Sequence, residues 1–368
     1  KASALAPANR DPLLGKAICL SYLGQHDDAM GVLHGMIDLG QWYLGEAHYW
    51  LAGNEHELGH IEKAVSSALL AVEKLGGEVI LADSISTDAT VDIAKRYPIT
   101  IVQLKNPEDR RCGVGPQLGY QVARGQYVYI LDGDMEMDPD FLPVAVAEME
   151  KDPWLGGVGG LIEEKSESSY QFRGRKRRKA EGVSGDVKWL DMGGLYRRAA
   201  LEQSGYFSNR NLHAYEEQDL GLRLGSYGWH LRRLDLRSVV HYGYTESSLK
   251  LLMRRWRSHY LDGGGEVLRA ALGKPYFIDI VMHQKHLFVG LALWCGLVAG
   301  LILLPINTWL FTATVLAIIL LVLIRAIKIG SLGDSLFAQL VWQVTALAMV
   351  RGFLMKPVSP SKTIDYVY

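Results

Sequence analysis

The pattern of hydrophobic and polar positions changes twice along the chain, near residue 76 and near residue 285. Between these points, short apolar runs alternate with amphipathic segments. The pattern predicts strands over 78–83, 99–104, 156–162 and 237–240, a strand starting at 127, and helices over 89–97, 117–124, 141–151 and 219–228. Strands that alternate with helices are typical of a doubly wound, largely parallel α/β sheet.

Beyond residue 285 the chain contains two almost continuous apolar runs, 287–304 and 306–324, neither of which carries a charge. At 1.5 Å per residue each run is long enough to cross a hydrocarbon layer of ~30 Å. A third run, 336–350, is shorter and contains Gln339 and Gln343. The sequence therefore predicts a membrane anchor over 286–355 with two or three apolar helices, the third either spanning the membrane or lying in its interface.

Basic residues beside the apolar runs indicate the orientation. Arg325 and Lys328 follow the second run, which favours a cytosolic position for that connection and for the soluble portion of the chain before residue 285. A fully spanning third run would place Arg351, Lys356 and Lys362 on the opposite side, which is a reason to doubt that it spans.

The first 75 residues contain an internal repeat. Segment 22–29 recurs as 57–64, with the matching glycines, Gly24 and Gly59, 35 residues apart. A period of about 34 residues with a glycine at the turn is typical of helical hairpins. Residues 1–75 thus resemble the tetratricopeptide repeat family, which implies a protein partner, although an unrelated helical bundle fits the same pattern.

Composition narrows the function. With 368 residues, 49% hydrophobic residues and a net charge of -1, the chain is neither disordered nor a protein that coats nucleic acid. Its three cysteines have no zinc-site or disulfide-framework spacing. One basic run, 173–179, is suited to anionic lipid or an anionic acceptor, or is a solvated loop.

The chemistry centres on the run 127–138, where a short apolar strand ends in several carboxylates. In open α/β sheets ligands bind beyond the carboxyl ends of the strands, and clustered carboxylates suit a hard divalent cation. Asp132 and Asp134 are therefore candidate ligands for a cation that holds a phosphate substrate. An acidic turn without ligand is the alternative for this run considered alone.

Four motifs occur in order: Asp83 after the strand 78–83, Asp132-Gly-Asp134, the acidic segment 216–219, and His241. Together they resemble the family 2 glycosyltransferases, which have the GT-A fold. The resemblance covers residues 76–257, and residues 258–285 are then an interfacial, amphipathic linker. It implies a nucleotide-diphosphate sugar as donor, a UDP-sugar being favoured, and Mg²⁺ or Mn²⁺ as cofactor.

The resemblance also implies roles on the donor side. Asp83 would bind the nucleobase, although it could instead cap the following helix. Asp134 would bind the metal, Asp132 the ribose or the metal, and His241 would be a further metal ligand unless it is structural. Arg111 lies in a basic, glycine-containing loop of the kind that approaches the diphosphate.

On the acceptor side, the resemblance makes Glu217 the general base, with Glu216 as the substitute. Acids also favour helix N-termini for electrostatic reasons, which is the alternative explanation. Gly193 belongs to a segment resembling the family's acceptor side. Leu252 stands where processive synthases have glutamine, which favours transfer of one or a few sugars.

Relatives in this family open with an apolar strand, and no clear equivalent precedes residue 76. Either the helix over 61–75 also serves as the first helix of the domain, or repeat and transferase sequences are joined; we favour the second. The expected function is membrane-bound, inverting sugar transfer to a membrane-associated, lipid-linked or glycan acceptor. The alternative is a scaffold that joins repeats to an inactive transferase-like domain.

Overall fold

The computed structural model describes residues 61–70, 76–165, 184–191, 193–242 and 247–368, and the single positions 25, 28, 32 and 72. Most of the first predicted repeat unit, 22–29, and half of the second, 57–64, fall outside these residues, and so does all of the basic run 173–179. The tetratricopeptide-like arrangement is therefore not seen.

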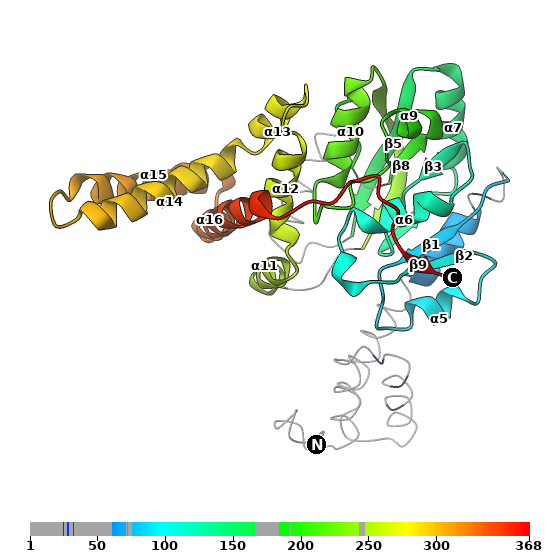
Figure 1. The fold of residues 1–368 in the computed structure, drawn as a ribbon, viewed down its shortest axis with the longest axis horizontal. Helices are drawn as coiled ribbons and strands as arrows, with labels where there is room; N and C mark the ends of the chain where they lie inside the picture. Colours follow the sequence, from blue (N-terminus) through cyan, green and yellow to red (C-terminus); the bar gives the residue numbers. More distant parts are fainter. Residues whose placement is uncertain are drawn as a thin grey trace.

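The described elements follow the predicted alternation of strands and helices (Figure 1). The strands are β1 (Ile80–Asp83), β2 (Thr100–Leu104), β3 (Tyr127–Tyr129), β4 (Met135–Met137), β5 (Leu155–Glu164), β6 (Gly185–Val187), β7 (Leu195–Arg197), β8 (His230–His241) and β9 (Tyr366–Val367). The helices of the first part are α5 (Thr90–Ala94), η1 (Pro107–Asp109), α6 (Val114–Val122), α7 (Phe141–Lys151), α9 (Arg198–Gln203) and α10 (Glu216–Ser226). Those of the second part are α11 (Ser248–Arg257), η2 (Tyr260–Asp262), α12 (Gly263–Ala270), α13 (Phe277–His283), α14 (Lys285–Leu303), α15 (Trp309–Ile329) and α16 (Leu332–Leu354).

The strands form two sheets, one in the order β1-β2-β9 and one in the order β3-β7-β5-β8-β4, with β6 beside β8. Among the described strands only β1–β2 and β5–β8 pair in parallel; the other pairs are antiparallel. The prediction of a largely parallel sheet is thus wrong, although the α/β class is confirmed. Parallel neighbours need a crossover connection, and α5 provides one for β1–β2, while α9 and α10 lie in the one for β5–β8.

The helical segment 61–70 belongs to the core of the α/β domain. Val65 packs in a cluster with Ile93 of α5, beside the smaller sheet. Ala68 packs against Phe141 of α7, beside the larger sheet. Because this segment contacts both sides, it acts as a helix of the domain and supports the first of the two sequence interpretations.

The predicted linker 258–285 folds into η2, α12 and α13, and packs on the α/β domain rather than lying apart from it. Val267 of α12 and Ile280 of α13 are fully buried in one cluster with Leu222 of α10. The contact is dense because α12 begins with three glycines. A Cβ on Gly263 would lie 2.7 Å from the backbone nitrogen of Ala214.

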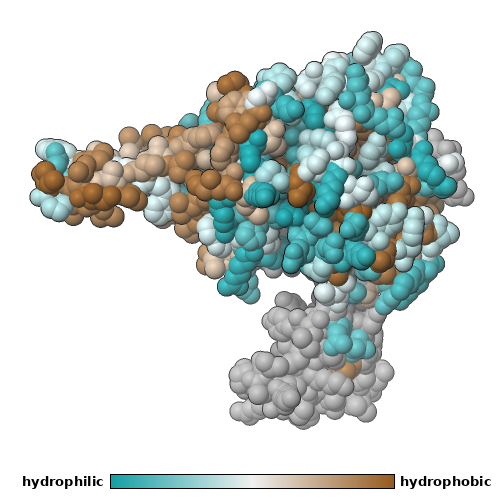
Figure 2. All heavy atoms as spheres, in the orientation of Figure 1, coloured by the Kyte–Doolittle hydropathy of each residue, from teal (hydrophilic) through white to brown (hydrophobic). Residues whose placement is uncertain are grey.

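Three helices, α14, α15 and α16, have the length and composition of membrane spans. The α14–α15 hairpin extends away from the α/β domain, and hydrophobic residues gather on it (Figure 2). Glycines bring its helices together: Gly296 faces Thr314, and Gly300 faces Phe311. The third predicted run lies within α16, which is longer than expected.

The end of α16 is attached to the α/β domain. Arg351 donates hydrogen bonds to the buried carboxylate of Asp262, the shortest at 2.6 Å. Beyond α16 the chain returns to the smaller sheet, where β9 pairs with β2. The side chain of Gln121 bonds both the amide nitrogen and the carbonyl of Ile364 there, at 2.8 and 3.1 Å.

Candidate functional site

A cavity of about 1500 Å³ joins the sequence motifs. At one end it is lined by Asp83 and the turn that follows β1, in the middle by acids from the β3–β4 turn and from α10, and at the other end by α14 and α16. These acids are Asp132, Asp134, Glu216 and Glu217, and Asp191, which precedes β7, also lines the cavity. Residues from distant parts of the chain therefore line one site, as the motif order predicted.

Asp83 occupies the end of β1 and is almost completely buried. Its carboxylate accepts hydrogen bonds from the backbone nitrogen of Ser86, at 3.1 and 3.2 Å, and from Nε2 of Gln103 at 2.8 Å. These bonds hold the turn after β1, so the structural alternative for Asp83 is present. A carboxylate has about four acceptor positions, which leaves capacity for a ligand in the cavity.

Asp134 lies beside His241 because β4 and β8 are antiparallel with Met135 opposite His241. The Nε2 atom of His241 is 3.2 Å from a carboxylate oxygen of Asp134, and Nδ1 bonds Glu164 on β5. Burial alone would lower the pKa of His241, but the bonds to the two carboxylates outweigh burial and raise it to about 9. Protonated His241 thus links two acids from different strands.

The residues around Asp134 fit a hard divalent cation only in part. Among the described positions, no three His, Cys, Asp or Glu side chains form a complete metal site by themselves. Mg²⁺ is commonly held by one or two carboxylates together with substrate phosphates, a set that Asp134 and Asp132 could complete. His241 could join them only after losing a proton, because a metal ligand must be neutral.

The acids at the start of α10 have different environments. Asp219 is fully buried and pairs with Arg223, 3.4 Å away, so it serves the fold. Glu216 and Glu217 are half-buried and line the cavity. Tyr215, just before them, has a left-handed backbone with φ of 72°, which turns the chain into the helix.

The pKa of both glutamates is raised. For Glu216, burial is the main cause, Asp132 adds to it, and the pKa is about 7. For Glu217, burial again comes first, followed by the charges of Glu216 and Asp132, and the pKa lies well above its usual value. Asp132 affects both glutamates because all three residues line the same cavity. A carboxyl group with such a pKa is suited to proton transfer near neutral pH.

The backbone before these acids is held by α12. Glu266, almost fully buried, accepts a hydrogen bond from the backbone nitrogen of His213 at 2.9 Å, and its other oxygen is 2.8 Å from Nδ1 of the same residue. Ala214, which follows His213 in the chain, packs directly against Gly263 of α12. The position of Glu217 therefore depends on contacts with α12.

Two predicted residues do not line the cavity. Arg111 turns back onto its own 3-10 turn, where it donates to the carbonyl of Glu108 at 3.3 Å and lies 3.9 Å from Asp109. Gly193 has a positive φ of 81° and lies against Val239, outside the cavity lining. Arg111 and Gly193 are therefore absent from the described residues that line the cavity.

Sequence reasoning missed several residues of the site. Asp191 pairs with Arg233 at 2.9 Å, and both line the cavity. Glu164 was not marked by any motif because only strand pairing places it beside His241. The end of the cavity near α14 and α16 is aromatic, and its residues have no family motif; they are Trp189, Tyr215, His283, His286 and Trp342.

Comparison with known proteins gives a family match for part of the chain. Residues 54–207 match the model of the family "Glycosyl transferase family 2". The match begins ahead of the predicted boundary at 76, so it includes the second predicted repeat unit, 57–64, and the helical segment 61–70.

Two relatives act on prenyl-linked molecules by name. A dodecaprenyl-phosphate galacturonate synthase of Rhizobium johnstonii is 31% identical over 103 residues, which are 26% of this chain and 30% of the relative. An N-acetylglucosaminyl-diphospho-decaprenol L-rhamnosyltransferase of Mycobacterium tuberculosis is 26% identical over 224 residues, covering 50% of this chain and 72% of the relative. The chain thus spans less than a third of the first relative and more than two thirds of the second.

Among solved structures, a mannosyltransferase of Pyrobaculum calidifontis in complex with GDP-Man and Mn²⁺ is similar with a TM-score of 0.46 and 16% identity, covering 80% of this chain and 82% of that one. Over residues 54–207 the chain is therefore similar to the family 2 glycosyltransferases, and it combines mixed α/β sheets with three apolar helices of membrane-spanning length.

Proposed function

We propose that the protein is a membrane-bound, inverting glycosyltransferase that moves a sugar from a nucleotide-diphosphate sugar to a hydroxyl group of a lipid-linked acceptor. A UDP-sugar is the favoured donor. The observation that carries this proposal is the single cavity that contains Asp83, Asp134 and Glu217 and continues to the apolar helices. Such a cavity can bring a donor, a base and an acceptor together.

The donor would bind at the β1 end of the cavity. Asp83 would accept a hydrogen bond from the imide N–H of a uracil-like base, while it keeps its bonds to Ser86 and Gln103. Asp134, with Asp132 and possible help from deprotonated His241, would hold Mg²⁺ or Mn²⁺. The bound cation would stabilise the negative charge of the departing diphosphate as a Lewis acid.

Glu217 would remove the proton from the acceptor hydroxyl. As the O–H bond breaks, the acceptor oxygen bonds to the anomeric carbon, and the bond from that carbon to the diphosphate breaks on the opposite face. The electron pair leaves with the nucleoside diphosphate, and the configuration at the anomeric carbon inverts. The raised pKa of Glu217 makes its deprotonated form a stronger base than an ordinary glutamate.

The acceptor would enter from the membrane side. The cavity is lined there by Leu287 of α14 and by Val341 and Trp342 of α16, so an apolar chain attached to the acceptor could remain near the membrane. The names of the two relatives agree with such an acceptor. Arg325 and Lys328 at the end of α15 favour a cytosolic position for the catalytic domain.

A panel of nucleotide sugars with Mn²⁺ or Mg²⁺ tests the proposal, with released nucleoside diphosphate as the measurement. Wild-type protein is expected to release it from one donor, and Asp134→Asn to lower the rate at least ~100-fold, because charge stabilisation at the leaving group is lost. Asp138→Asn is the matched control. Asp138 lies in the same acidic run but pairs with Arg237 outside the cavity lining, so the rate should stay within about twofold.

Two results would contradict the proposal. If Asp134→Asn releases the diphosphate as fast as wild type, Asp134 does not hold the donor. If folded wild-type protein releases none from any donor, with or without prenyl-linked acceptor, the scaffold alternative is correct.

A further inference from the structure

The chain enters and leaves the apolar helices on the same side. The α/β domain precedes α14, and β9, which follows α16, pairs with β2 of that domain. A chain that starts and ends on one side of a membrane crosses it an even number of times. Only two of the three candidate helices can therefore cross, and the α14–α15 hairpin is such a pair.

The contacts of α16 place it at the base of the hairpin. It meets α14 at Gly290 and α15 at Val322, both in the halves of these helices nearer the α/β domain. Its other end meets the domain, where a Cβ on Gly352 would lie 2.0 Å from the carbonyl oxygen of Asp262. Figure 1 shows the hairpin extending beyond α16. With the hairpin in the bilayer, α16 lies at the level of the lipid headgroups.

Helix α11 packs on α16 at this level. Leu252 of α11 is buried in one cluster with Ala348 of α16, and Trp256 packs against the same cluster. The guanidinium of Arg351 lies 4.3 Å from the centre of the Trp256 ring. Trp256 thus fastens α11 to α16 and is absent from the cavity lining, whereas its neighbour Arg255 is part of that lining.

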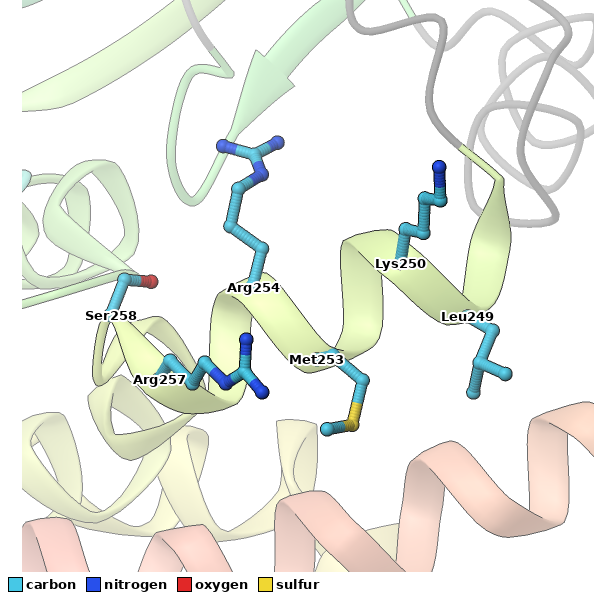
Figure 3. A pocket seen from close by; sticks show the side chains of 6 residues that line it. All are labelled: Leu249, Lys250, Met253, Arg254, Arg257 and Ser258. Atoms are coloured by element: carbon cyan, nitrogen blue, oxygen red, sulfur yellow. The ribbon is translucent and has the colours of Figure 1, made fainter. Parts of the chain in front are cut away.

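The apolar stripe of α11 is only half covered. Leu249 and Met253 belong to the same stripe as Leu252 and Trp256 by helical spacing, yet they are 57% and 46% exposed. They border an open hollow of about 680 Å³. In Figure 3, Leu249 and Met253 point to the side on which a neighbouring helix lies.

Three basic residues also line this hollow. Among the described residues, Lys250, Arg254, Arg257 and Ser258 line it together with Leu249 and Met253. Lys250 and Arg254 point away from the apolar side chains (Figure 3). All three basic residues are exposed, and α11 contains no acidic residue. Apolar side chains on one side and cations on the other match an amphiphile with a negative headgroup.

We propose that this hollow, lined by Leu249, Met253 and the three basic residues, binds one anionic phospholipid at the membrane surface. An acyl chain would lie along Leu249 and Met253, and the phosphate would contact Lys250, Arg254 and Arg257. A water-soluble phosphate would use the cations but leave the two apolar side chains exposed. A lipid uses both, and its attraction would fix α11, whose Arg255 lines the catalytic cavity.

Lipid binding to the full chain in detergent tests this proposal, by native mass spectrometry during titration with phosphatidylglycerol or phosphatidylcholine. The wild-type protein is expected to bind one phosphatidylglycerol molecule more tightly than phosphatidylcholine. The triple variant Lys250→Gln, Arg254→Gln, Arg257→Gln should bind it at least tenfold more weakly, since each basic residue near a lipid surface contributes about fivefold. Lys95→Gln, Arg96→Gln, Lys105→Gln makes the same charge change on exposed residues near α5 and β2 and should bind as wild type does.

A second variant, Leu249→Gln with Met253→Gln, tests the acyl contact and keeps every charge. This variant should also bind phosphatidylglycerol more weakly. The extent to which glycerol phosphate competes for the cations should stay the same. Equal binding of phosphatidylcholine, equal weakening in the control variant, or full competition by glycerol phosphate at the same concentration would each overturn the proposal. None of these results depends on sugar transfer, so the proposed function can fail separately.

Discussion

The three acids in the first turn of α10 have different environments. Asp219 is neutralised by Arg223 in the core, whereas Glu216 and Glu217 face the cavity together. Burial raises the pKa of both carboxyl groups, and the charge of Asp132 adds to this effect. The charge of Glu216 raises the pKa of Glu217 further, to well above its usual value.

The pH dependence of turnover follows from this environment. A base must be deprotonated, so kcat should rise with pH through an acidic limb well above the ordinary glutamate pKa. Glu217→Gln should lower kcat at least ~100-fold at all pH values with little change in the KM of the donor. Glu216→Gln removes a negative charge beside Glu217. It should therefore lower the pKa of Glu217 and shift the acidic limb of the kcat profile to lower pH, while activity remains. Steady-state kinetics between pH 5 and pH 9 measures both effects.

The roles would be exchanged if Glu216→Gln abolished turnover and Glu217→Gln kept it. If the acidic limb of the kcat profile has the same midpoint in Glu216→Gln as in wild type, the two carboxyl groups do not interact. Either result would contradict the assignment of Glu217.

At the scale of elements, glycines decide how closely the helices approach. A Cβ on Gly265 of α12 would lie 1.8 Å from the carbonyl oxygen of Met349 on α16, and one on Gly352 would meet Asp262. Both neighbours are backbone atoms, which cannot move aside as a side chain can. The backbones of α12 and α16 are therefore in direct contact. An ion pair between Arg351 and Asp262 lies beside this contact and stabilises it.

Alanine at these positions should separate the two helices. Gly265→Ala and Gly352→Ala are each expected to lower the free energy of unfolding by about 2 kcal/mol or more, the usual range for overpacking being ~1–3 kcal/mol. Gly333→Ala is the control on α16, because a Cβ there meets nothing within 4 Å. It should be neutral or stabilising by up to ~1 kcal/mol, since alanine favours helix. Thermal unfolding in detergent measures the differences, and equal melting temperatures for all three variants would contradict the close contact.

At the scale of the whole molecule, the small strand β9 determines the topology of the apolar part. It pairs with β2, and Arg210 binds the carbonyls of Lys362 and Thr363 at 2.9 and 3.0 Å. These bonds keep the tail on the catalytic side. The basic residues after α16 then agree with the orientation that Arg325 and Lys328 indicate.

Labelling of single cysteines in sealed vesicles tests this topology, after the three native cysteines have been replaced. Asn307→Cys lies at the tip of the hairpin and Ser361→Cys in the tail. A maleimide that cannot cross membranes should label Ser361→Cys from the side of the catalytic domain and Asn307→Cys from the opposite side only. Lys95→Cys, exposed on α5's C-terminal side, marks the catalytic side as a control. Labelling of Ser361→Cys together with Asn307→Cys from one side would exclude two crossings.

The sequence by itself predicted the alternation of strands and helices, the apolar hairpin and the candidate acids. Hydrophobic periodicity and the length of an apolar run are local properties, so they can be recognised in the sequence without knowledge of the fold. Asp83, Asp134 and Glu217 were found because each follows a recognisable motif. The tertiary structure confirmed that they line one cavity.

Only the tertiary structure decided strand direction, the partners of His241, and the removal of Arg111 and Gly193 from the cavity lining. It also decided that helix 61–70 packs in the α/β domain and that the tail returns to that domain. The physical reason is that these features depend on register between segments far apart in the chain. A shift of one residue reverses the face on which a strand side chain lies, and no local pattern records that choice.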